Sequence, residues 1–295
     1  MSPTPSSAGP RPRDKLVGRL WVLSAAVLWS SSGLFVKSPL FADWPDDARG
    51  PLLAFWRAVF AALVMAPLIR RPRWRRDLVP LTLSFTAMNV LYLTSMTLTT
   101  AANAIWLQYT APLWVFLIGA FVLGGPVVRR DLLPMGFGLA GVSLILAFEV
   151  RGQAQVGVFC GLASGLAFGS IVLFMRRLAA ENPAWLVAVN HVVAALALLP
   201  WVVYCGIWPT PWQLVVLAAF GALQMAVPYL MLIRGLRSIS GQEAAAIGLV
   251  EPVLLPVWVL LAWAEQPAWW TVGGSSLILC GLAWRYAPFF RGNAE

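Results

Sequence analysis

The chain has 295 residues, of which 60% are hydrophobic and 11% are charged, and its mean hydropathy is +0.76. Soluble domains carry roughly 25% charged residues, so this composition excludes a water-soluble globular protein. The net charge is +9, and the three cysteines stand far apart without a CxxC or Cys/His cluster, which argues against a disulfide framework and against a metal site.

Ten apolar runs follow one another along the chain, each close to the ~20 residues that a membrane-spanning helix needs. We expect these spans at 17–36, 52–69, 79–98, 102–123, 132–149, 156–175, 184–204, 212–233, 243–262 and 268–287. The runs are continuously apolar and do not alternate as barrel strands would, so they predict an all-α membrane protein with ten transmembrane helices.

The two ends of the chain are polar. Residues 1–16 are rich in Pro and Ser and predict a disordered cytoplasmic leader, and 288–295 would form a cytoplasmic tail. The first apolar run lacks a small-residue cleavage site after a short apolar core, so we interpret it as a retained span rather than a signal peptide.

The basic residues are distributed unevenly between the loops. If the N-terminus is cytoplasmic, 17 of the 21 Lys and Arg residues lie on that side and three on the other. The 17 are Arg11, Arg13, Lys15, Arg19, Arg70, Arg71, Arg73, Arg75, Arg76, Arg129, Arg130, Arg176, Arg177, Arg234, Arg237, Arg285 and Arg291. This bias predicts a multi-pass membrane protein with both termini cytoplasmic, and it explains the net charge without a nucleic-acid partner. A polybasic partner-binding segment is the alternative for RRPRWRR (70–76) alone.

The chain carries an internal duplication of residues 17–149 in residues 156–287. A shift of 133 places FWRAVFAALVMAP (55–67) over AVNHVVAALALLP (188–200), and a shift of 140 places Ala111-Pro112 over Glu251-Pro252. Five spans per half is an odd number, so the second half must be inverted in the membrane. The charges agree, because the loop after the second span has five arginines and its counterpart, CGIWPTP, has none. Inverted repeats are typical of secondary transporters, whose substrate site lies near the midplane.

Four segments follow one another in a recognisable order: LWSSSGLFVKSPL (28–40), AFWRAVFAALVMAPL (54–68), TAPLWVFLIGAFVLGGPVVRRDLLPMGFGLAGVSLIL (110–146) and GLVEPVLLPVWVLLAWAEQPAWWTVGGSSLILCGL (248–282). This ordered set resembles the EamA-type branch of the drug/metabolite transporter superfamily. The resemblance implies a carrier of two inverted five-helix halves in the bacterial inner membrane that moves small organic solutes, commonly as an exporter. The family pattern usually closes the fourth span with LGE, but here the acid is replaced by Gly125. Its counterpart Glu265 is kept, and we assign it a structural role at most.

Glu251 is the foremost candidate for a working group. Pro252 follows it, loosens the helix and frees backbone carbonyls that a cavity or ligand could satisfy. A carboxyl group at membrane depth is costly and marks a functional position by default. We expect Glu251 to bind a substrate cation or to couple transport to a proton; the alternative is that it reaches headgroup water near the cytoplasmic end.

Two further ionisable residues lie inside predicted spans. Arg57 either reaches the outer headgroups and the loop acids Asp43, Asp46 and Asp47, or contacts a substrate carboxylate. His191 lies one place past the duplicate of Arg57 and is either a packing residue or a proton relay.

Neutral polar and aromatic side chains complete the predicted site. They are Asn89, Tyr92, Trp106, Gln108, Tyr109, Gln224 and Tyr229, with Pro112 and Pro252 as matching helix kinks. Aromatic faces with a few amides suit amphipathic or cationic solutes. For Trp106 and Tyr109 an interfacial or packing role is the alternative, and we assign Trp44, Trp74, Trp208, Trp212, Trp269 and Trp270 to the aromatic belts.

Glycine patterns point to helix packing. MGFGLAG (135–141) has the spacing of a dinucleotide fingerprint but lies in an apolar span without a preceding strand. Gly161, Gly165 and Gly169 form a ridge for a neighbouring helix or for a second subunit of a homodimer.

The function that we expect is a secondary transporter, foremost an exporter of small metabolites, amino acids or drug-like compounds by alternating access, with proton coupling left open. Its partners would be a small-molecule substrate and the lipid bilayer. An uptake permease of the same fold is the alternative. An intramembrane transferase needs clustered acids or a nucleophile with a base, so we do not expect an enzyme. The sequence has no GxxxxGK[ST] loop, and we expect no cofactor.

Overall fold

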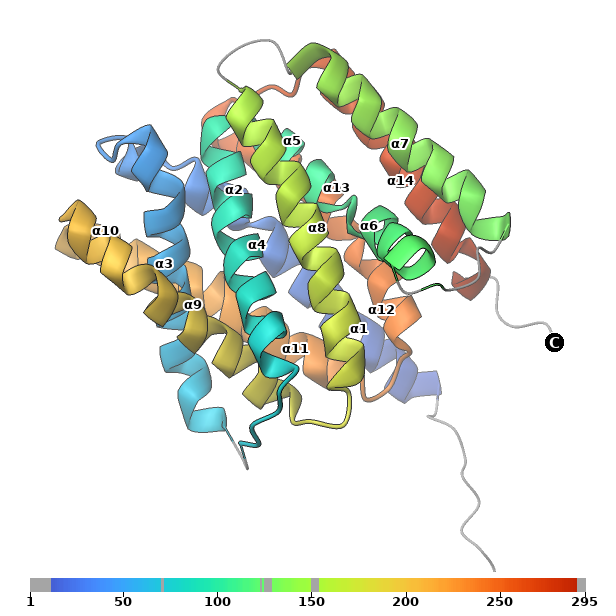
Figure 1. Ribbon diagram of the computed structural model, residues 1–295, viewed down its shortest axis with the longest axis horizontal. Helices are drawn as coiled ribbons and strands as arrows, with labels where there is room; N and C mark the ends of the chain where they lie inside the picture. Colours follow the sequence, from blue (N-terminus) through green and yellow to red (C-terminus); the bar gives the residue numbers. More distant parts are fainter. Residues whose placement is uncertain (1–11, 70–71, 123, 125–128, 150–153, 291–295) are drawn as a thin grey trace, which may run out of the picture.

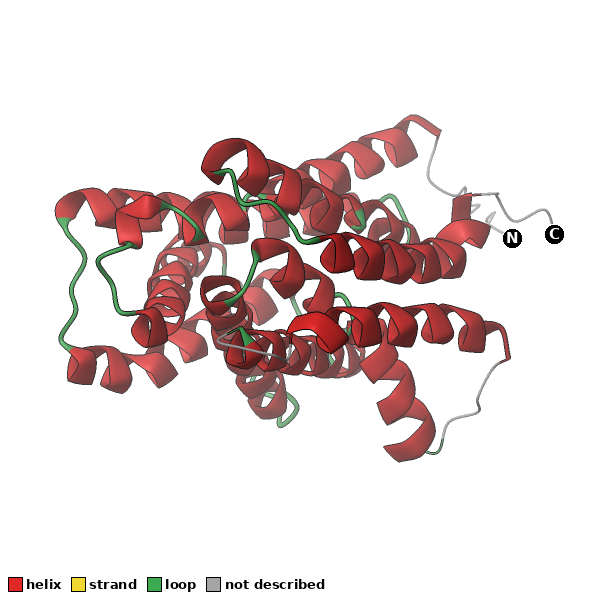
Figure 2. Cartoon of the chain, turned by 90° about the horizontal axis from the view of Figure 1, so that it is seen from above, coloured by secondary structure: helices red, strands yellow, loops and turns green. Residues whose placement is uncertain are grey.

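The computed structural model describes residues 12–69, 72–122, 124, 129–149 and 154–290, and every regular element in this part of the chain is a helix (Figures 1 and 2). The first half comprises α1 (Pro12–Ser30), α2 (Ser32–Val36), η1 (Pro39–Phe41), α3 (Asp46–Met65), η2 (Ala66–Leu68), α4 (Leu78–Leu98), α5 (Ala101–Gln108), α6 (Ala111–Leu117), η3 (Ile118–Val122) and α7 (Arg129–Glu149). The second half comprises α8 (Gln155–Arg177), α9 (Pro183–Cys205), α10 (Pro211–Gly221), η4 (Ala222–Ala226), α11 (Val227–Gly235), α12 (Gly241–Gly248), α13 (Val250–Trp263) and α14 (Trp269–Phe290).

The ten predicted spans are confirmed as ten helical passes. Nine of the described helical segments are long and apolar enough to cross a membrane, and α14 is the tenth pass with 22 residues. The leader differs from the prediction, because α1 begins at Pro12 and residues 12–16 are helical. The rest of the leader, residues 1–11, lies outside the described residues. The first, fourth, eighth and ninth passes are interrupted by short breaks or by a change of helix type. Hydropathy alone does not show these interruptions.

The two inverted halves correspond residue by residue around the fourth and ninth passes. A shift of 140 residues carries α5, Ala101–Gln108, onto α12, Gly241–Gly248. Both helices start in the same way: Thr100 accepts a hydrogen bond from the Asn103 amide, and Ser240 accepts one from the Glu243 amide, each at 3.1 Å. Such capping satisfies one of the free amides at a helix start. The duplication is therefore preserved at the level of helix termini.

Most helices belong to two groups of three passes, each of which mixes the two halves. Bundle A contains α4, the α5–α6 pass and α8; bundle B contains the α1–α2 pass, the α10–η4–α11 pass and the α12–α13 pass. Figure 1 shows α4 and α8 of bundle A side by side. Helices α3 and α9 pack against each other and against both bundles. The inverted repeat exchanges bundle A with bundle B.

Helices α7 and α14 form a separate pair at the edge of the protein (Figure 1). A Cβ on Gly274 would lie 2.6 Å from the carbonyl oxygen of Gly141, and one on Gly281 would lie 2.7 Å from that of Pro134. A shift of 140 residues exchanges these two contacts, so the pair follows the same pseudo-symmetry. Gly136 and Gly138 face open space, so the predicted packing role of MGFGLAG holds for Gly141 alone.

The glycine ridge of α8 is used within the chain. A Cβ on Gly161 would approach Leu107 at 2.9 Å, and one on Gly165 would approach the Leu107 carbonyl at 2.7 Å. The ridge therefore lets α8 pack closely on α5, as small residues do in membrane proteins. It is not free to receive a second subunit.

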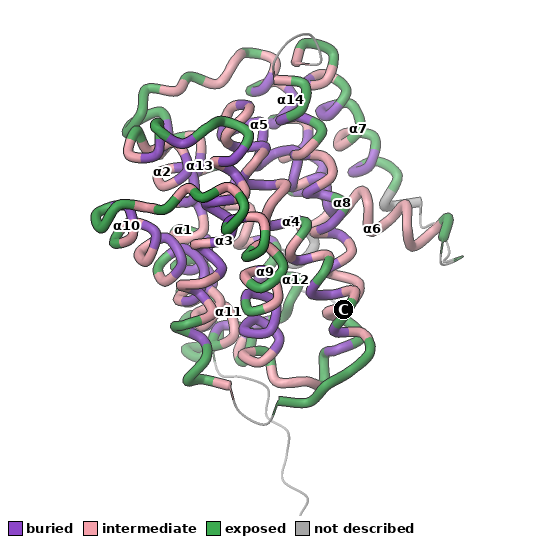
Figure 3. The backbone as a smooth tube through the Cα atoms, turned by 60° about the vertical axis from the view of Figure 1, so that its left-hand side comes forward, coloured by how far each residue is buried: buried purple, intermediate pink, exposed green. Residues whose placement is uncertain are grey.

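Burial follows the expected pattern of a membrane bundle. Figure 3 shows buried segments concentrated inside the protein and exposed ones at its periphery and ends. Large apolar side chains such as Leu63, Leu83 and Leu261 face outward, where lipid would cover them. The assignment of Trp44 to the aromatic belt is wrong, because Trp44 is 3% exposed and packs on Phe41 with ring centroids 5.0 Å apart.

Candidate functional site

The fourth and ninth passes are interrupted at matching depth. The fourth breaks between Gln108 and Ala111, and the ninth breaks at Leu249. Pro112 and Pro252 each stand in the first turn after the break, where the missing amide proton of proline costs no helical hydrogen bond. Such breaks leave backbone carbonyls and amides without helical partners, and a cavity or ligand can satisfy them.

Tyr109 links the two breaks directly. Its hydroxyl lies 2.9 Å from Oε2 of Glu251 and 3.1 Å from the carbonyl oxygen of Gly248, so it can donate its proton to either acceptor. Tyr109 and Glu251 are both partly buried. The phenol of one half therefore holds the carboxyl group of the other at the seam between them, which argues against a Glu251 side chain that only reaches headgroup water.

Arg57 lies deep inside the protein on α3 and is 2% exposed. Its Nη2 donates to Oδ1 of Asn89, and its Nη1 donates to Oε1 of Gln224 at 3.2 Å. The amides are held in turn: Asn89 donates to the Ala54 carbonyl at 3.0 Å, and Gln224 donates to the Trp29 carbonyl at 3.3 Å. The guanidinium group is thus positioned by two neutral amides from α4 and η4.

The headgroup alternative for Arg57 is wrong. Asp46 pairs with Arg49 at 2.9 Å, and Asp43 accepts a bond from Gln213 at 3.3 Å. Arg57 lies instead beside the Phe220 ring, 5.2 Å from its centroid. Because burying an unpaired charge is costly, its retention at this depth favours a functional position.

Gln224 lies on η4, a π-helical turn inside the eighth pass. Single π turns within α-helices occur often at functional sites because they redirect side chains. Here the turn places Gln224 against Arg57.

Several buried polar atoms on the packed helices α3 and α9 have no hydrogen-bond partner in the described protein. They are Nε of Arg57, Oδ1 of Asn190, and both ring nitrogens of His191. The imidazole of His191 packs edge-on against Phe85 at 4.8 Å and lies 6.2 Å from the Tyr229 ring. Leaving such groups unsatisfied costs about 1–3 kcal/mol each, so these atoms are candidates to bind a polar ligand.

Aromatic side chains form the walls near these groups. Trp29 meets Tyr229 edge-on at 5.2 Å, and the Tyr92 hydroxyl lies 3.2 Å from Oγ of Ser32. Glu251 lies within electrostatic range of Arg57, Tyr92 and Tyr229, so its carboxyl group belongs to the same buried region.

Trp106 and Gln108 lie at the edge of this arrangement. Trp106 is 5% exposed and its ring centroid is 6.4 Å from that of Tyr109, so its alternative as a belt residue is wrong. Gln108 is 7% exposed, and a Cβ on Gly165 would lie 3.2 Å from its carbonyl oxygen. The backbone of Gln108 therefore faces α8.

The structure adds residues that the sequence interpretation missed. The first pass breaks at Ser31, between α1 and α2, and Ser30 accepts a hydrogen bond from Nε1 of Trp258 at 2.9 Å. The triplet Ser30-Ser31-Ser32 is the signal that could have indicated this break, because serine hydroxyls compete for helix backbone groups.

Two grooves open on the surface, and the first of them reaches the break at Tyr109. It runs between α6, α7 and α14 and is lined by Tyr109, Pro112 and Leu282 among others. The second is lined by Leu68, Glu181, Arg234 and Arg237, at the end of the bundle where the arginine-rich loops lie.

Comparisons with known proteins agree with the architecture. The model of the EamA-like transporter family matches residues 16–147 and again residues 155–286. An uncharacterized transporter of Archaeoglobus fulgidus is 25% identical over 276 residues, which is 91% of this chain and 96% of that protein. A crystal structure at 17% identity superposes with a TM-score of 0.66 and covers 95% of this chain and 99% of the other, which shows the shared fold.

Proposed function

Because the chain belongs to the EamA-like transporter family, we propose that this multi-pass membrane transporter is a secondary carrier that exports small organic solutes by alternating access. Bundles A and B would rock around the buried polar cluster, which would open in turn to each side of the membrane. Inverted-repeat carriers place their sites at the repeat interface in this way.

The observation that carries the proposal is the position of Arg57. It is a buried guanidinium group held by Asn89 and Gln224, which are neutral, with its Nε left unpartnered. An anionic group of the cargo would supply the direct negative partner that Asn89 and Gln224 cannot be. Guanidinium groups suit carboxylates because the two geometries match.

The other end of the cargo would meet Glu251. Its carboxyl group, held by Tyr109, would either bind a cationic group of the cargo or exchange a proton during the cycle. Trp29, Tyr229 and Phe220 would contact an apolar part between the two ends. The favoured cargo is therefore a small amphipathic carboxylate, with or without an amino group.

Topology and direction are part of the proposal. The family resemblance supports a bacterial inner-membrane location, and the positive-inside bias supports cytoplasmic termini. The groove beside Arg234 and Arg237 would then open to the cytoplasm. Export agrees with the family resemblance; uptake by the same fold is the second candidate. A homodimer stays a prediction. The glycine ridge of α8 no longer supports it, because that ridge packs against α5 and α6 of the same chain.

The test is a counterflow screen in proteoliposomes loaded with amino acids, organic cations or carboxylate metabolites, with and without an imposed pH gradient. We expect exchange of at least one carboxylate class, lost in Arg57→Gln and retained in the matched variant Arg49→Gln. Exchange of organic cations alone, unaffected by Arg57→Gln, would contradict the assignment of the anion site.

A further inference from the structure

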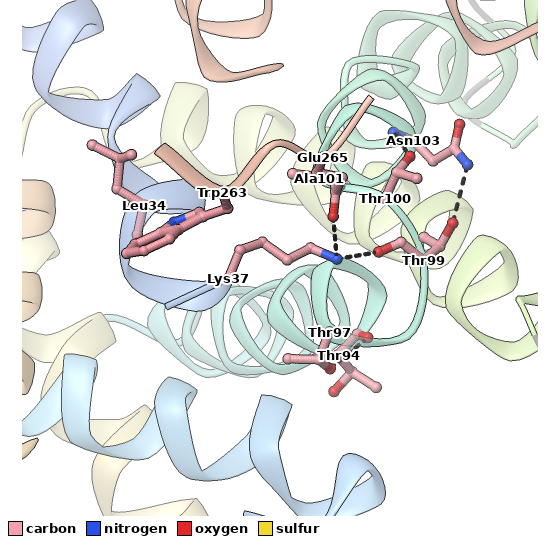
Figure 4. A network of polar contacts seen from close by, with 10 residues as sticks. All are labelled: Leu34, Lys37, Thr94, Thr97, Thr99, Thr100, Ala101, Asn103, Trp263 and Glu265. Atoms are coloured by element: carbon pink, nitrogen blue, oxygen red, sulfur yellow. Dashed lines mark hydrogen bonds and ion pairs between the residues drawn. The ribbon is translucent and has the colours of Figure 1, made fainter. Parts of the chain in front are cut away.

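A polar network joins the first and ninth passes to the junction of the third and fourth (Figure 4). It lies at the opposite end of α4 from the arginine-rich loop that precedes this helix. Nζ of Lys37 lies 2.7 Å from Oε2 of Glu265 and donates to the Thr99 carbonyl at 2.7 Å. Oε1 of Glu265 accepts a hydrogen bond from the Ala101 amide, also at 2.7 Å. We call these four residues the latch. The side chains of Lys37 and Glu265 are 18% and 23% exposed, so water screens the pair only in part.

The carboxylate of Glu265 lies at the N-terminus of α5, where a negative charge is stabilised. Ala101 is the first residue of α5, and its amide is one of those that a helix start leaves free. A negative charge there also interacts favourably with the helix dipole. The neighbouring groups are held as well: Asn103 donates to Oγ1 of Thr99 at 3.0 Å and accepts from Thr271 at 2.7 Å.

The latch connects the two bundles. Lys37 follows α2 and Glu265 follows α13, which both belong to bundle B, and Nε1 of Trp263 ties these two helices through the Leu34 carbonyl at 3.2 Å. Thr99 and Ala101 form the junction of α4 with α5 in bundle A. The two bundles therefore cannot separate at this end unless Lys37 and Glu265 release Thr99 and Ala101.

The opposite end has a differently placed ion pair. Arg19 and Glu243 lie 2.5 Å apart and join α1 to α12, which both belong to bundle B. That pair can stay intact while the bundles separate. In the sequence, the duplication pairs Glu265 with Gly125, which has no carboxylate to offer. The acid of the latch is thus present in one half of the duplicated chain only.

We propose that Lys37 and Glu265 are the gate of the outer end, and that the latch must open once in each transport cycle. This inference rests on the alternating-access function proposed above. It assigns to Glu265 a role in the cycle beyond the structural one expected from the sequence. Since the acid is present in one half only, the latch favours the state that is closed to the outside, and the carrier rests open toward the cytoplasm or occluded.

A reporter below the latch tests this inference without any knowledge of the cargo. Ser32 suits the purpose because it lies against Tyr92 across the interface between the bundles, five residues before Lys37. A Ser32→Cys reporter would be placed in a background with Cys160, Cys205 and Cys280 changed to Ser. The measured quantity is its reaction rate with a membrane-impermeant maleimide, added to right-side-out or to inside-out vesicles.

Glu265→Gln and Lys37→Gln should each raise the rate from the outside roughly tenfold, as expected when an ion pair at a helix start is lost. Glu243→Gln is the matched control, since it breaks an ion pair of the same two passes within one bundle; its rate should stay within about twofold. The rate from the inside should not rise in the latch variants, which separates gate opening from general unfolding.

Three results would overturn the inference: unchanged outside rates in both latch variants, an equal rise in Glu243→Gln, or a rise from both sides. Reaction from neither side in every variant would overturn the alternating-access function as well. A cargo assignment that proves wrong leaves the latch result intact, so the two failures can be told apart.

Discussion

The hydroxyl of Tyr109 lies 2.9 Å from Oε2 of Glu251, across a separation of 142 residues in the sequence. Each of the two residues stands at a helix break, and the two breaks correspond under the duplication. The contact therefore joins the two halves at the point where both lose regular structure. In a carrier that works by moving one bundle against the other, such a contact must change during the cycle.

Removing that contact should slow transport. Tyr109→Phe keeps the ring and deletes the hydroxyl, so Glu251 loses its donor. A hydrogen bond to a charged group is worth about 1.5–3 kcal/mol, so we expect flux at low cargo concentration to fall by roughly tenfold or more. Flux in proteoliposomes is the measurement, with Tyr204→Phe as control because Tyr204 is 87% exposed. Equal flux in both variants would show that the contact is dispensable.

Neutralising Glu251 should uncouple transport from the proton gradient. Glu251→Gln resembles the protonated carboxyl group and cannot release a proton. Exchange of cargo between equal pools should continue, while accumulation driven by a pH gradient should be lost. Glu181→Gln is the control, since Glu181 pairs with Arg75 at 2.8 Å at the end of the bundle. An unchanged pH profile in Glu251→Gln would remove Glu251 from the coupling mechanism.

Replacing the guanidinium group of Arg57 should weaken cargo binding even though the charge is kept. Arg57→Lys cannot donate to Asn89 and Gln224 together with the same geometry, so both amides lose their fixed partner. We expect the KM for cargo to rise by about tenfold to a hundredfold with a smaller change in maximal rate. Arg49→Lys, on the same helix and partly exposed, should leave the KM unchanged. A rise of equal size in the Arg49 variant would point to a general effect on folding.

The α7–α14 pair offers a test of the fold with a matched control less than one helical turn away. Gly141→Ala would drive a methyl group into the Gly274 carbonyl, whereas Gly138→Ala meets open space. Overpacking costs about 1–3 kcal/mol, so Gly141→Ala should lower the thermal unfolding temperature in detergent. Gly138→Ala should leave it equal or raise it, because alanine favours helix. The reverse order would contradict the described packing of α7 on α14.

Hydropathy predicted the ten passes because each apolar run matches the thickness of a bilayer. The duplicated Ala111-Pro112 and Glu251-Pro252 pointed to the matching breaks, since proline cannot continue a helix without loss. What the sequence could not show is which face of each pass turns inward. The spans are apolar on all sides, so the sequence left open whether the Arg57 side chain points into the protein or toward the outer headgroups.

Long-range polar contacts were also beyond reach from the sequence. In the sequence, Lys37 and Glu265 look like any other charged residues at the ends of spans. Only the packing of α2, α5 and α13 makes them partners. The same holds for Ser30 and Trp258, whose hydrogen bond depends on how the first and ninth passes lie against each other. Duplication predicts which positions are equivalent, but the contacts between helices depend on how the side chains of the packed helices fit together.

The most direct test of the account is the accessibility of its centre from the two sides of the membrane. His191 is fully buried beside Phe85 and Tyr229, and neither of its ring nitrogens has a protein partner, so His191→Cys removes no hydrogen bond. In the cysteine-free background, this thiol should react with an impermeant reagent from the inside and, in Glu265→Gln, also from the outside. A thiol that reacts from neither side, in any variant, would show a centre closed to both compartments and would contradict the account.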